Sequence, residues 1–323
     1  MTTAQPSPGA ARPGPAAAGQ PALPDQRDAP APVVRGDPVE VSDGVFVIPD
    51  NRVPLVPNVG LVVGDTAVLV IDTGLGPRNG AHVLDQARRL AGGRPLYLTV
   101  THFHPEHGFG AQAFRGAATI IYNAAQREEL RRKGAGYIEM FTGMSPAYAA
   151  ELEGVELTGP DITYDGRAEI DLGGHTAVLQ SRGPAHTASD QSIHVDGRVL
   201  FTGDLLETRS FPIVPYFPPF DTDVDVAGWI TVLGQFLVLD PAVVVPGHGE
   251  VTDTTLIRDV RDYLDYVLRQ AARLRADGAS PDDAAAAIEK DARARWTTWD
   301  YPYWIGLAAR AVYQAGLPEG ATT

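Results

Sequence analysis

Short apolar runs separated by turn residues begin soon after residue 38. They are rich in valine, isoleucine and leucine and are bounded by glycine or aspartate, a pattern typical of buried strands. The first runs are residues 45–48, 59–63 and 67–71. Residues 80–90 have apolar side chains at helical spacing and stop at two glycines, so they predict a helix. A second series of strands and helices follows over residues 168–248.

This alternation predicts an α/β fold. Two βα-rich halves without a short repeat suit two mixed sheets packed face to face with helices outside, because each sheet must bury one face. With 323 residues and 44% hydrophobic side chains, the chain can form one sizeable domain or two small ones. We expect a disordered, Ala- and Pro-rich tail over residues 1–35. The main domain is expected over 36–276, and a C-terminal helical extension packed on it over 277–323.

The chain after residue 248 is predicted to be largely helical. Residues 252–276 have an apolar stripe behind good capping residues, and a shorter helix is expected after Ser280. A last helix is expected over residues 305–314. Residues 296–304 hold three of the four tryptophans. Such a concentration is typical of a homo-oligomer interface or a pocket lid, and core packing is the alternative.

Two segments near the middle of the chain are expected to shape a substrate site. Residues 126–133 predict a solvated helix, whereas the apolar residues of 137–144 could overhang whatever site the fold builds. Residues 211–220 contain too many prolines for a regular helix or a central strand. Their aromatic side chains predict a hydrophobic pocket wall, and packing on the core or on a second subunit is the alternative.

Charge and composition exclude several classes of binding partner. The formal charge of -14 disfavours nucleic acid and anionic membranes as general partners. No apolar run is long enough to span a bilayer, and none follows a basic start as in a signal peptide. The absence of cysteine fits a reducing compartment. We therefore expect a cytoplasmic protein whose partner is a small molecule.

The densest chemistry lies at residues 101–107, Thr-His-Phe-His-Pro-Glu-His, directly after the apolar run 95–100. Three imidazoles and a carboxylate there would sit on the loop that leaves a buried strand, where side chains can converge. Imidazole and carboxylate are the ligands that zinc and similar divalent ions take in proteins. The segment therefore predicts a metal site, and a solvated polar loop is the alternative.

Three more candidate ligands occur further along the chain. His186, Asp204 and His248 each lie just past an apolar segment and a glycine or proline. That is how a strand end commonly leads into a turn that carries ligands. The three residues are what a binuclear site would need from elsewhere in the fold.

Together these motifs resemble the metallo-β-lactamase-fold hydrolase superfamily, whose signature is His-x-His-x-Asp-His followed by a His, an Asp and a His. The resemblance covers residues 38–270 and implies the two-sheet sandwich of that family. It implies that the ligands are His102, His104 and His186 for a first metal, Glu106, His107 and His248 for a second, and Asp204 bridging both. Asp72 resembles the family aspartate that orients a ligand histidine. A turn residue at a strand end is the alternative for Asp72.

Glu106 departs from the family pattern, which has aspartate at this position. The extra methylene moves the carboxylate by about one bond length, whereas metal–oxygen distances tolerate only roughly ±0.2 Å. Glu106 is therefore predicted either as a ligand of the second metal or as a general base acting through a metal-bound water. A second site that is shifted, weak or absent is the alternative.

The resemblance implies a hydrolase with two divalent metal ions, most simply Zn²⁺. Zinc lowers the pKa of a bound water to ~7, and the resulting hydroxide would attack the carbonyl of an ester, thioester or lactone. The expected substrate is small and partly hydrophobic. True β-lactamases of the main zinc subclass have a cysteine near the position of Asp204, and this chain has none. Asp204 makes the site more similar to glyoxalase II and acyl-lactone hydrolases.

Two other functions stay open. Imidazole binds iron as well as zinc, so an iron-dependent oxidoreductase, or a lyase or cyclase on the same fold, is the first. The second is a non-catalytic metal-binding protein in which Glu106 has disabled one site. The candidate substrate contacts are Arg182, Arg209, Phe211, Tyr216 and Phe217. The arginines could bind a carboxylate, and for them ordinary surface charge is the alternative.

Overall fold

The computed structural model describes residues 25–215 and 220–315. Its first sheet contains seven strands in sequence order: β1 (Val39–Ser42), β2 (Val45–Ile48), β3 (Val59–Val63), β4 (Val68–Ile71), β5 (Leu96–Thr99), β6 (Thr119–Asn123) and β7 (Ile162–Tyr164). Strands β1 to β4 pair antiparallel, and β4 to β7 pair parallel. Every side chain of β4 is buried, as expected of a central strand covered on both faces.

The second sheet contains five strands: β8 (Arg167–Asp171), β9 (Thr176–Ser181), β10 (Gln191–Val195), β11 (Val199–Phe201) and β12 (Val243–Val245). Its order is β12-β11-β10-β9-β8, and only the β11–β12 pair is parallel. The two sheets face each other across a core that includes Val62, Leu69, Leu179 and Ile193. The predicted α/β sandwich of two mixed sheets is thus confirmed.

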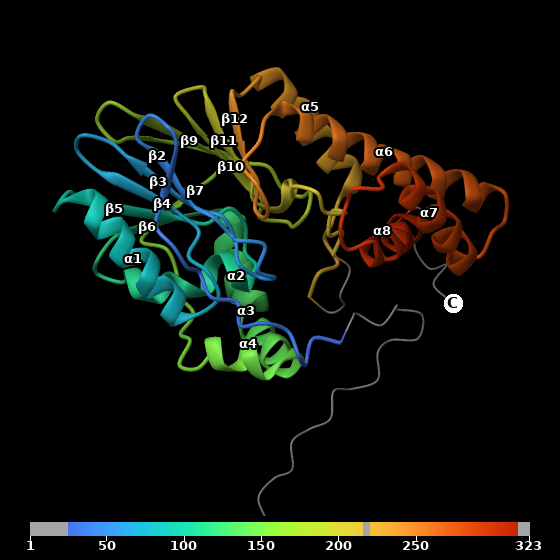
Figure 1. Cartoon of the computed structure of the whole chain (residues 1–323), viewed down its shortest axis with the longest axis horizontal. Helices are drawn as coiled ribbons and strands as arrows, with labels where there is room; N and C mark the ends of the chain where they lie inside the picture. The colour runs from blue at the N-terminus through green and yellow to red at the C-terminus, as the bar shows by residue number, and fades with distance from the viewer. Residues whose placement is uncertain (1–24, 216–219, 316–323) are drawn as a thin grey trace, which may run out of the picture.

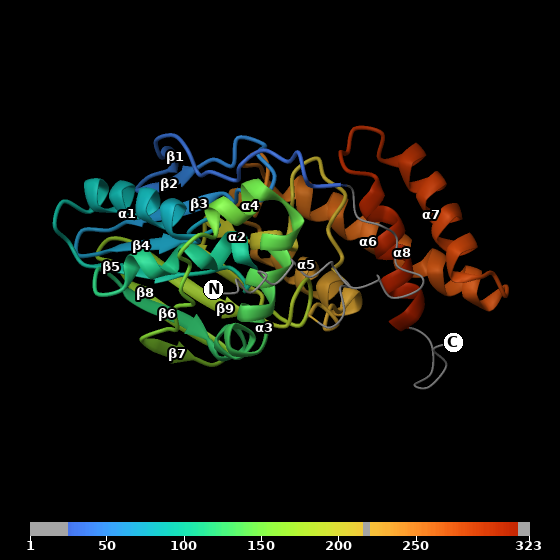
Figure 2. The same cartoon turned by 90° about the horizontal axis from the view of Figure 1, so that it is seen from below.

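Helices cover the two outer faces of the sandwich (Figure 1). The helices of the described residues are α1 (Pro77–Ala91), α2 (Pro105–Gly108), α3 (Ala124–Met144), α4 (Pro146–Glu151), α5 (Val226–Leu239), α6 (Thr254–Ala276), α7 (Pro281–Arg295) and α8 (Tyr303–Ala315), with short 3-10 turns η1 (Phe109–Phe114) and η2 (Gly203–Leu205). Helix α1 packs on the seven-stranded sheet, and α5 and α6 pack on β11 and β12. Helices α6 to α8 extend beyond one end of the sandwich (Figure 2).

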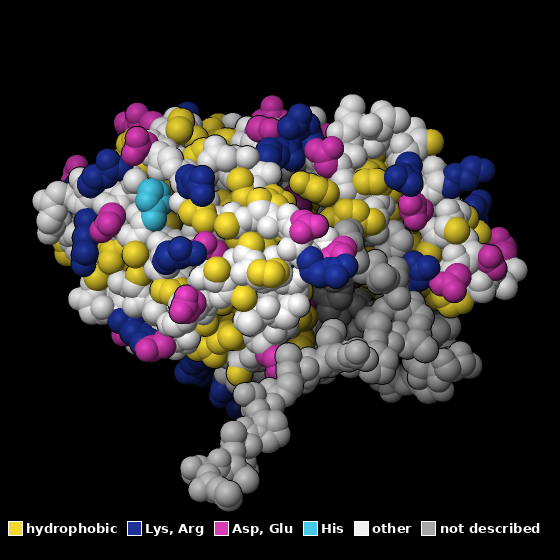
Figure 3. All heavy atoms as spheres, turned by 60° about the horizontal axis from the view of Figure 1, so that its bottom comes forward, with side chains coloured by type: hydrophobic (Ala, Val, Ile, Leu, Met, Phe, Trp, Pro, Cys, Tyr) yellow, Lys and Arg dark blue, Asp and Glu magenta, His cyan; other side chains and the backbone are white. Residues whose placement is uncertain are grey.

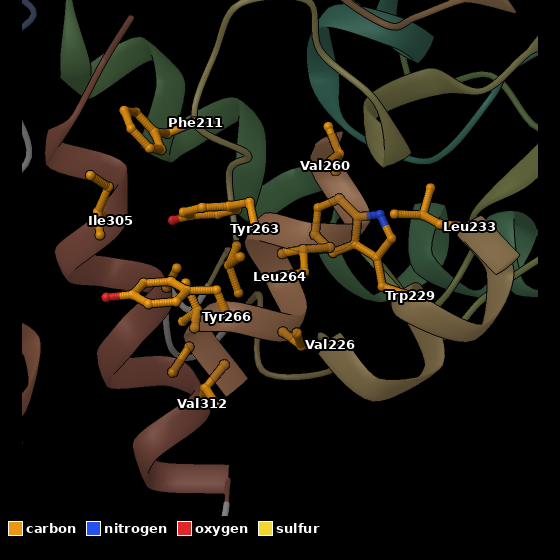
Figure 4. Close-up of a cluster of buried hydrophobic side chains, with 14 of the residues drawn as sticks. Phe211, Val226, Trp229, Leu233, Val260, Tyr263, Leu264, Tyr266, Ile305 and Val312 are labelled. Carbon is orange, nitrogen blue, oxygen red and sulfur yellow. The ribbon is translucent and has the colours of Figure 1, made fainter. Parts of the chain in front are cut away.

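The C-terminal helices share one hydrophobic core with α5 and α6. Trp229 of α5 and Tyr263 of α6 are fully buried there (Figure 4). Trp296 contacts Tyr263 edge to face and Trp299 contacts it at a tilt, with ring centroids 5.3 and 5.7 Å apart. These two tryptophans therefore pack against the core, while an oligomer interface through the remaining aromatics of 296–304 stays a prediction.

Two segments differ from their predictions. Residues 1–24 of the expected tail lie outside the described residues, but Val34 is buried and its N–H donates to Asn79 Oδ1 at 2.6 Å. The prediction of disorder up to residue 35 is therefore wrong at Val34, because α1 provides both apolar contacts and a hydrogen bond there. The helix expected to be solvated over 126–133 is part of α3, and it buries Glu129 and Lys133.

The acidic excess is not gathered on the face shown in Figure 3, where Lys and Arg side chains lie among Asp and Glu. Within the described residues, no helix combines the length and the apolar composition needed to cross a bilayer.

Candidate metal centre

The predicted ligands all lie just after the ends of strands. His102 and His104 lie on the turn after β5, Glu106 and His107 lie in α2, which follows that turn, and the others follow β9, β11 and β12. The structure brings them into two overlapping groups whose ligand atoms lie within 4.8 Å of one another. We call them cluster 1, formed by His102, His104, His186 and Asp204, and cluster 2, formed by Glu106, His107, Asp204 and His248.

Cluster 1 has the spacing that a tetrahedral ion requires. His104 Nδ1 lies 3.0 Å from His102 Nε2 and 3.4 Å from His186 Nε2. Zinc with Zn–N bonds of ~2.0–2.1 Å holds its ligand atoms about 3.3 Å apart. The three imidazole nitrogens therefore already lie near the corners of such a site.

Asp204 faces both clusters, one carboxylate oxygen to each. Its Oδ2 lies 3.8 Å from His102 Nε2 and 3.9 Å from His186 Nε2. Its Oδ1 lies 3.2 Å from His107 Nε2 and 3.6 Å from His248 Nε2. The turn of Gly247 comes so close that a Cβ there would lie 2.0 Å from Asp204 Oδ1, so only glycine fits. A carboxylate placed in this way could be shared between two ions, one in each cluster.

Asp72 orients one of these histidines. It has a left-handed backbone with φ of 68° at the end of β4, and it is buried. Its Oδ2 lies 2.9 Å from His107 Nδ1 and accepts from the Thr101 hydroxyl at 2.9 Å, while Oδ1 accepts from the Thr101 N–H. Holding Nδ1 leaves Nε2 of His107 free to face Asp204.

The other histidines are held in the same way through the nitrogen that faces away from the centre. The contacts are His102 Nδ1 to Thr101 Oγ1 at 3.2 Å, His186 Nδ1 to Ile213 O at 2.9 Å, His248 Nδ1 to Val56 O at 2.8 Å and, more loosely, His104 Nε2 to Asp221 Oδ1 at 3.7 Å. Such outer contacts fix the ring orientation and the tautomer of a ligand histidine.

The electrostatics of the centre favour positive charge between the ligands. Burial lowers the pKa of His102 well below its usual range and that of His186 to about 3, so both are neutral. Against the same burial, Asp221 raises the pKa of His104 to about 9, and Asp204 and Asp72 raise the pKa of His107 well above its usual range. Where imidazoles hold a proton this firmly, a metal cation can take its place.

Three buried ligand atoms of cluster 2 make no well-aligned hydrogen bond to a described residue: Glu106 Oε2, His107 Nε2 and Asp204 Oδ1, the last two of which lie 3.2 Å apart. Leaving such groups unpaired costs roughly 1–3 kcal/mol each, and more when they are charged. A divalent ion would satisfy all three. The longer Glu106 side chain thus still reaches cluster 2, and the donor set of both clusters fits a pair of divalent ions.

The clusters lie in a cavity of about 360 Å³. His104, Glu106, His186, Asp204 and His248 line its floor. Its wall is largely apolar and includes Leu55, Met140, Phe141, Met144, Tyr148, Ile213, Tyr303 and Trp304. Segment 137–144 of α3, which the sequence suggested as an overhang, therefore does face the centre.

The three predicted substrate contacts that the structure describes do not line this cavity. Arg182 donates to Ser192 Oγ and Gln235 Oε1 and lies over Phe236, so it is directed toward α5. Arg209 is exposed and pairs with Glu250 at 2.8 Å. Phe211 points into the hydrophobic core beside Tyr263 (Figure 4). Tyr216 and Phe217 lie outside the described residues.

Asp221 and Glu207 are two of the three described acidic cavity residues that the sequence did not indicate, and the third is Asp50. Asp221 is buried, accepts a hydrogen bond from Tyr137 and lies 3.5 Å from Lys133 Nζ. Despite burial, His104, Tyr137 and Lys133 lower its pKa to about 2. Glu207 is buried beside the centre, where burial and Asp204 raise its pKa well above the usual range. No motif marks either residue.

Comparison with known proteins places these residues in a family. The family model described as the metallo-beta-lactamase superfamily matches residues 52–248. Among curated proteins, acyl-coenzyme A thioesterase MBLAC2 of Bos taurus is 29% identical over 189 residues, and that of Homo sapiens is 28% identical. The match covers 51% of this chain and 64% of each relative.

Solved structures show the same fold at low sequence identity. The metallo-beta-lactamase from Pontibacter korlensis aligns over 71% of this chain and 98% of its own, with a TM-score of 0.56 and 17% identity. The sec-alkylsulfatase Pisa1 from Pseudomonas sp. aligns over 87% of this chain and 50% of its own, with a TM-score of 0.68 and 18% identity.

Proposed function

Because the chain belongs to the metallo-beta-lactamase superfamily, we propose that it is a binuclear metal-dependent hydrolase that cleaves an ester, thioester or lactone of a small, partly hydrophobic substrate. The observation that carries the proposal is the placement of Asp204, whose two oxygens face different histidine clusters. A protein that bound one structural ion would need neither the second cluster nor a cavity above it.

Each of the seven predicted ligands has a proposed role. His102, His104 and His186 would hold one ion and Glu106, His107 and His248 the other, with Asp204 between them. Two divalent ions bound there would supply an activated water near neutral pH and a Lewis acid for the substrate carbonyl. Asp72 keeps Nε2 of His107 directed at the centre.

Glu106 has two proposed roles. Its Oε2 is buried, unpaired among the described residues and directed into cluster 2. It can therefore be a ligand of the second ion, or it can accept a proton as a general base. The Glu106→Asp variant distinguishes the two roles. If Glu106 is a metal ligand, the shorter aspartate should change the metal content. If Glu106 is a general base, aspartate should lower kcat and leave the metal content unchanged.

The thioester class is supported by the two relatives and by the cavity. MBLAC2 is named as an acyl-coenzyme A thioesterase, and the match to it includes about half of this chain. The apolar wall suits the acyl side of such a substrate, since ligand pockets combine apolar walls with a few polar groups. Zinc is the proposed metal, and iron is the alternative.

A substrate panel tests the proposal. The purified chain is assayed with a p-nitrophenyl ester, an acyl thioester, an acyl lactone, a β-lactam and an alkyl sulfate, before and after chelation and with Zn²⁺ or Fe²⁺ restored. We expect turnover of the first three classes that is lost on chelation and recovered with Zn²⁺. Turnover of only the lactam or the sulfate, or oxygen consumption with Fe²⁺, would contradict it.

A further inference from the structure

One face of α3 lines the cavity above the metal centre. Tyr137, Met140, Phe141 and Met144 are spaced i, i+3, i+4 and i+7, so they share one side of the helix, and all four line the cavity. Thr142 is exposed and does not line it. The helix thus turns an unbroken apolar stripe toward the floor.

Part of the cavity wall comes from outside the segment that matches the family. Trp304 of α8 lines it and stacks on Tyr303 with ring centroids 4.8 Å apart. Residues 52–248 match the family model, so α8 lies outside the matched segment. Leu55 and Tyr148 complete the wall between these two helices. We call the set formed by Leu55, Met140, Phe141, Met144, Tyr148 and Trp304 the apolar wall.

The dimensions and chemistry of the apolar wall suit a flexible chain. A volume of about 360 Å³ is near the small end of ligand pockets, which span ~300–1,000 Å³. The two methionines are unbranched and adapt to an irregular apolar partner. Within the described residues the wall offers aromatic and aliphatic surface and the Tyr148 hydroxyl, which already bonds Gln26.

The charge of the same cavity limits which leaving groups the substrate can have. Carboxyl groups of Asp50, Glu106, Asp204, Glu207 and Asp221 line it. Among the described lining residues the one lysine or arginine is Arg52, and it already pairs with Glu250 at 2.6 Å and lies 3.9 Å from Asp300. Two bound metal ions would offset the carboxylates at the floor, but among the described lining residues no free cation remains for a phosphate-rich group.

From these two features we propose that the apolar wall binds the acyl chain of the substrate and that the leaving group is an uncharged alcohol or thiol. The inference rests on the proposed hydrolase function and specifies its substrate class. The reaction joins a water oxygen to the acyl carbon and breaks the C–S or C–O bond, and the products are a fatty acid and a neutral thiol or alcohol. The α8 extension would then set which chain lengths fit.

A chain-length series tests the acyl half. Straight-chain acyl thioesters of N-acetylcysteamine, from acetyl to dodecanoyl, are compared by kcat/KM. Burial of a methylene is worth ~0.8 kcal/mol, so each added methylene should raise kcat/KM about fourfold until the wall is filled. A profile that is flat or that falls from acetyl onward would overturn the proposal.

Met144→Trp should fill the cavity and shorten the chain that fits. We expect the ratio of octanoyl to acetyl kcat/KM to fall at least tenfold. Thr142→Trp places the same new side chain on the exposed side of α3 and should leave that ratio as in the wild type. A ratio unchanged in Met144→Trp would overturn the assignment, and because it is a ratio, partial unfolding cannot imitate the expected result.

The leaving-group half is tested with matched octanoyl thioesters of N-acetylcysteamine and of coenzyme A. We expect kcat/KM to be at least tenfold higher for the neutral thiol at low salt, with the gap narrowing as salt screens the carboxylates. A preference for the coenzyme A thioester would overturn this half.

A binding experiment distinguishes failure of the apolar-wall assignment from failure of the proposed hydrolase function. If no ester or thioester is cleaved, titration calorimetry of octanamide against acetamide still tests the apolar wall without turnover. Binding of octanamide alone, weakened in Met144→Trp but not in Thr142→Trp, would support the wall as an acyl site. Equal or undetectable binding of both amides would overturn it.

Discussion

The floor and the wall of the cavity are built on different principles. The floor belongs to a set of seven ligand side chains placed just after strand ends, and each histidine has a second contact such as that of His107 with Asp72. The wall is made of side chains from α3, α4 and α8 together with Leu55. The floor therefore depends on positions within tenths of an ångström, whereas the wall depends on volume. Changes to the floor should abolish function, and changes to the wall should retune it.

The largest effect is expected from Asp204→Asn. This substitution keeps the size of the side chain but removes the charge that faces both clusters, so both ions should bind weakly. Loss of a metal Lewis acid is worth several kcal/mol, and we expect kcat/KM for the best substrate to fall about a thousandfold or more. Circular dichroism confirms the fold, and near wild-type activity would contradict the bridging role.

Lys133→Met should strongly destabilise the folded state. Lys133 is buried among Glu129, Asp221 and Asp223, so its removal leaves buried carboxylates without a cation. Removal of one partner from such a network costs about 3–5 kcal/mol. The measurement is the free energy of unfolding in urea. Lys290→Met, at the exposed second lysine of the chain, is the matched control and should change it by less than about 0.5 kcal/mol.

Asp72→Asn tests whether the floor needs its outer contacts. An amide can accept a hydrogen bond from His107 but carries no charge to raise the basicity of the ring. Loss of such a contact lowers metal affinity about 10–100-fold. Competition with a coloured chelator measures it. Asp196→Asn removes a surface carboxylate that contacts His175 at 2.6 Å, and it should leave the affinity unchanged.

The smallest effect concerns the turn that carries His186. Burial raises the pKa of Asp190 to about 7, although Thr187 donates two hydrogen bonds to it. The folded chain therefore holds this proton between pH ~4 and 7 where the unfolded chain releases it, so Asp190 makes stability fall as the pH rises through that window. Asp190→Asn should remove this part of the slope of unfolding free energy against pH. An unchanged slope would contradict the assignment.

The floor could be predicted because its chemistry is concentrated in sequence. His102, His104, Glu106 and His107 lie within six residues after a strand, and residues 45–48 and 59–63 coincide with β2 and β3. The strands could be predicted from short apolar runs separated by turn residues, because the burial of a strand shows in its local sequence. The ligands could be predicted because they lie in short polar motifs directly after those runs.

The rest of the cavity depends on contacts between distant segments. Asp221 and Lys133 are 88 residues apart, and nothing in either segment indicates that they meet. Arg182 lies close to His186 in sequence but is directed toward Phe236, because adjacency along a chain does not fix the direction of a side chain. Trp304 reaches the cavity only because α8 folds back on α6.

Metal content tests the central claim, two ions held by two clusters that share Asp204, most directly. Elemental analysis is made on the wild type and on His186→Gln and His248→Gln, each of which belongs to one cluster only. The account predicts about two divalent ions per chain in the wild type and about one in each variant. Fewer than two ions in the wild type, or an unchanged content in His248→Gln, would contradict it.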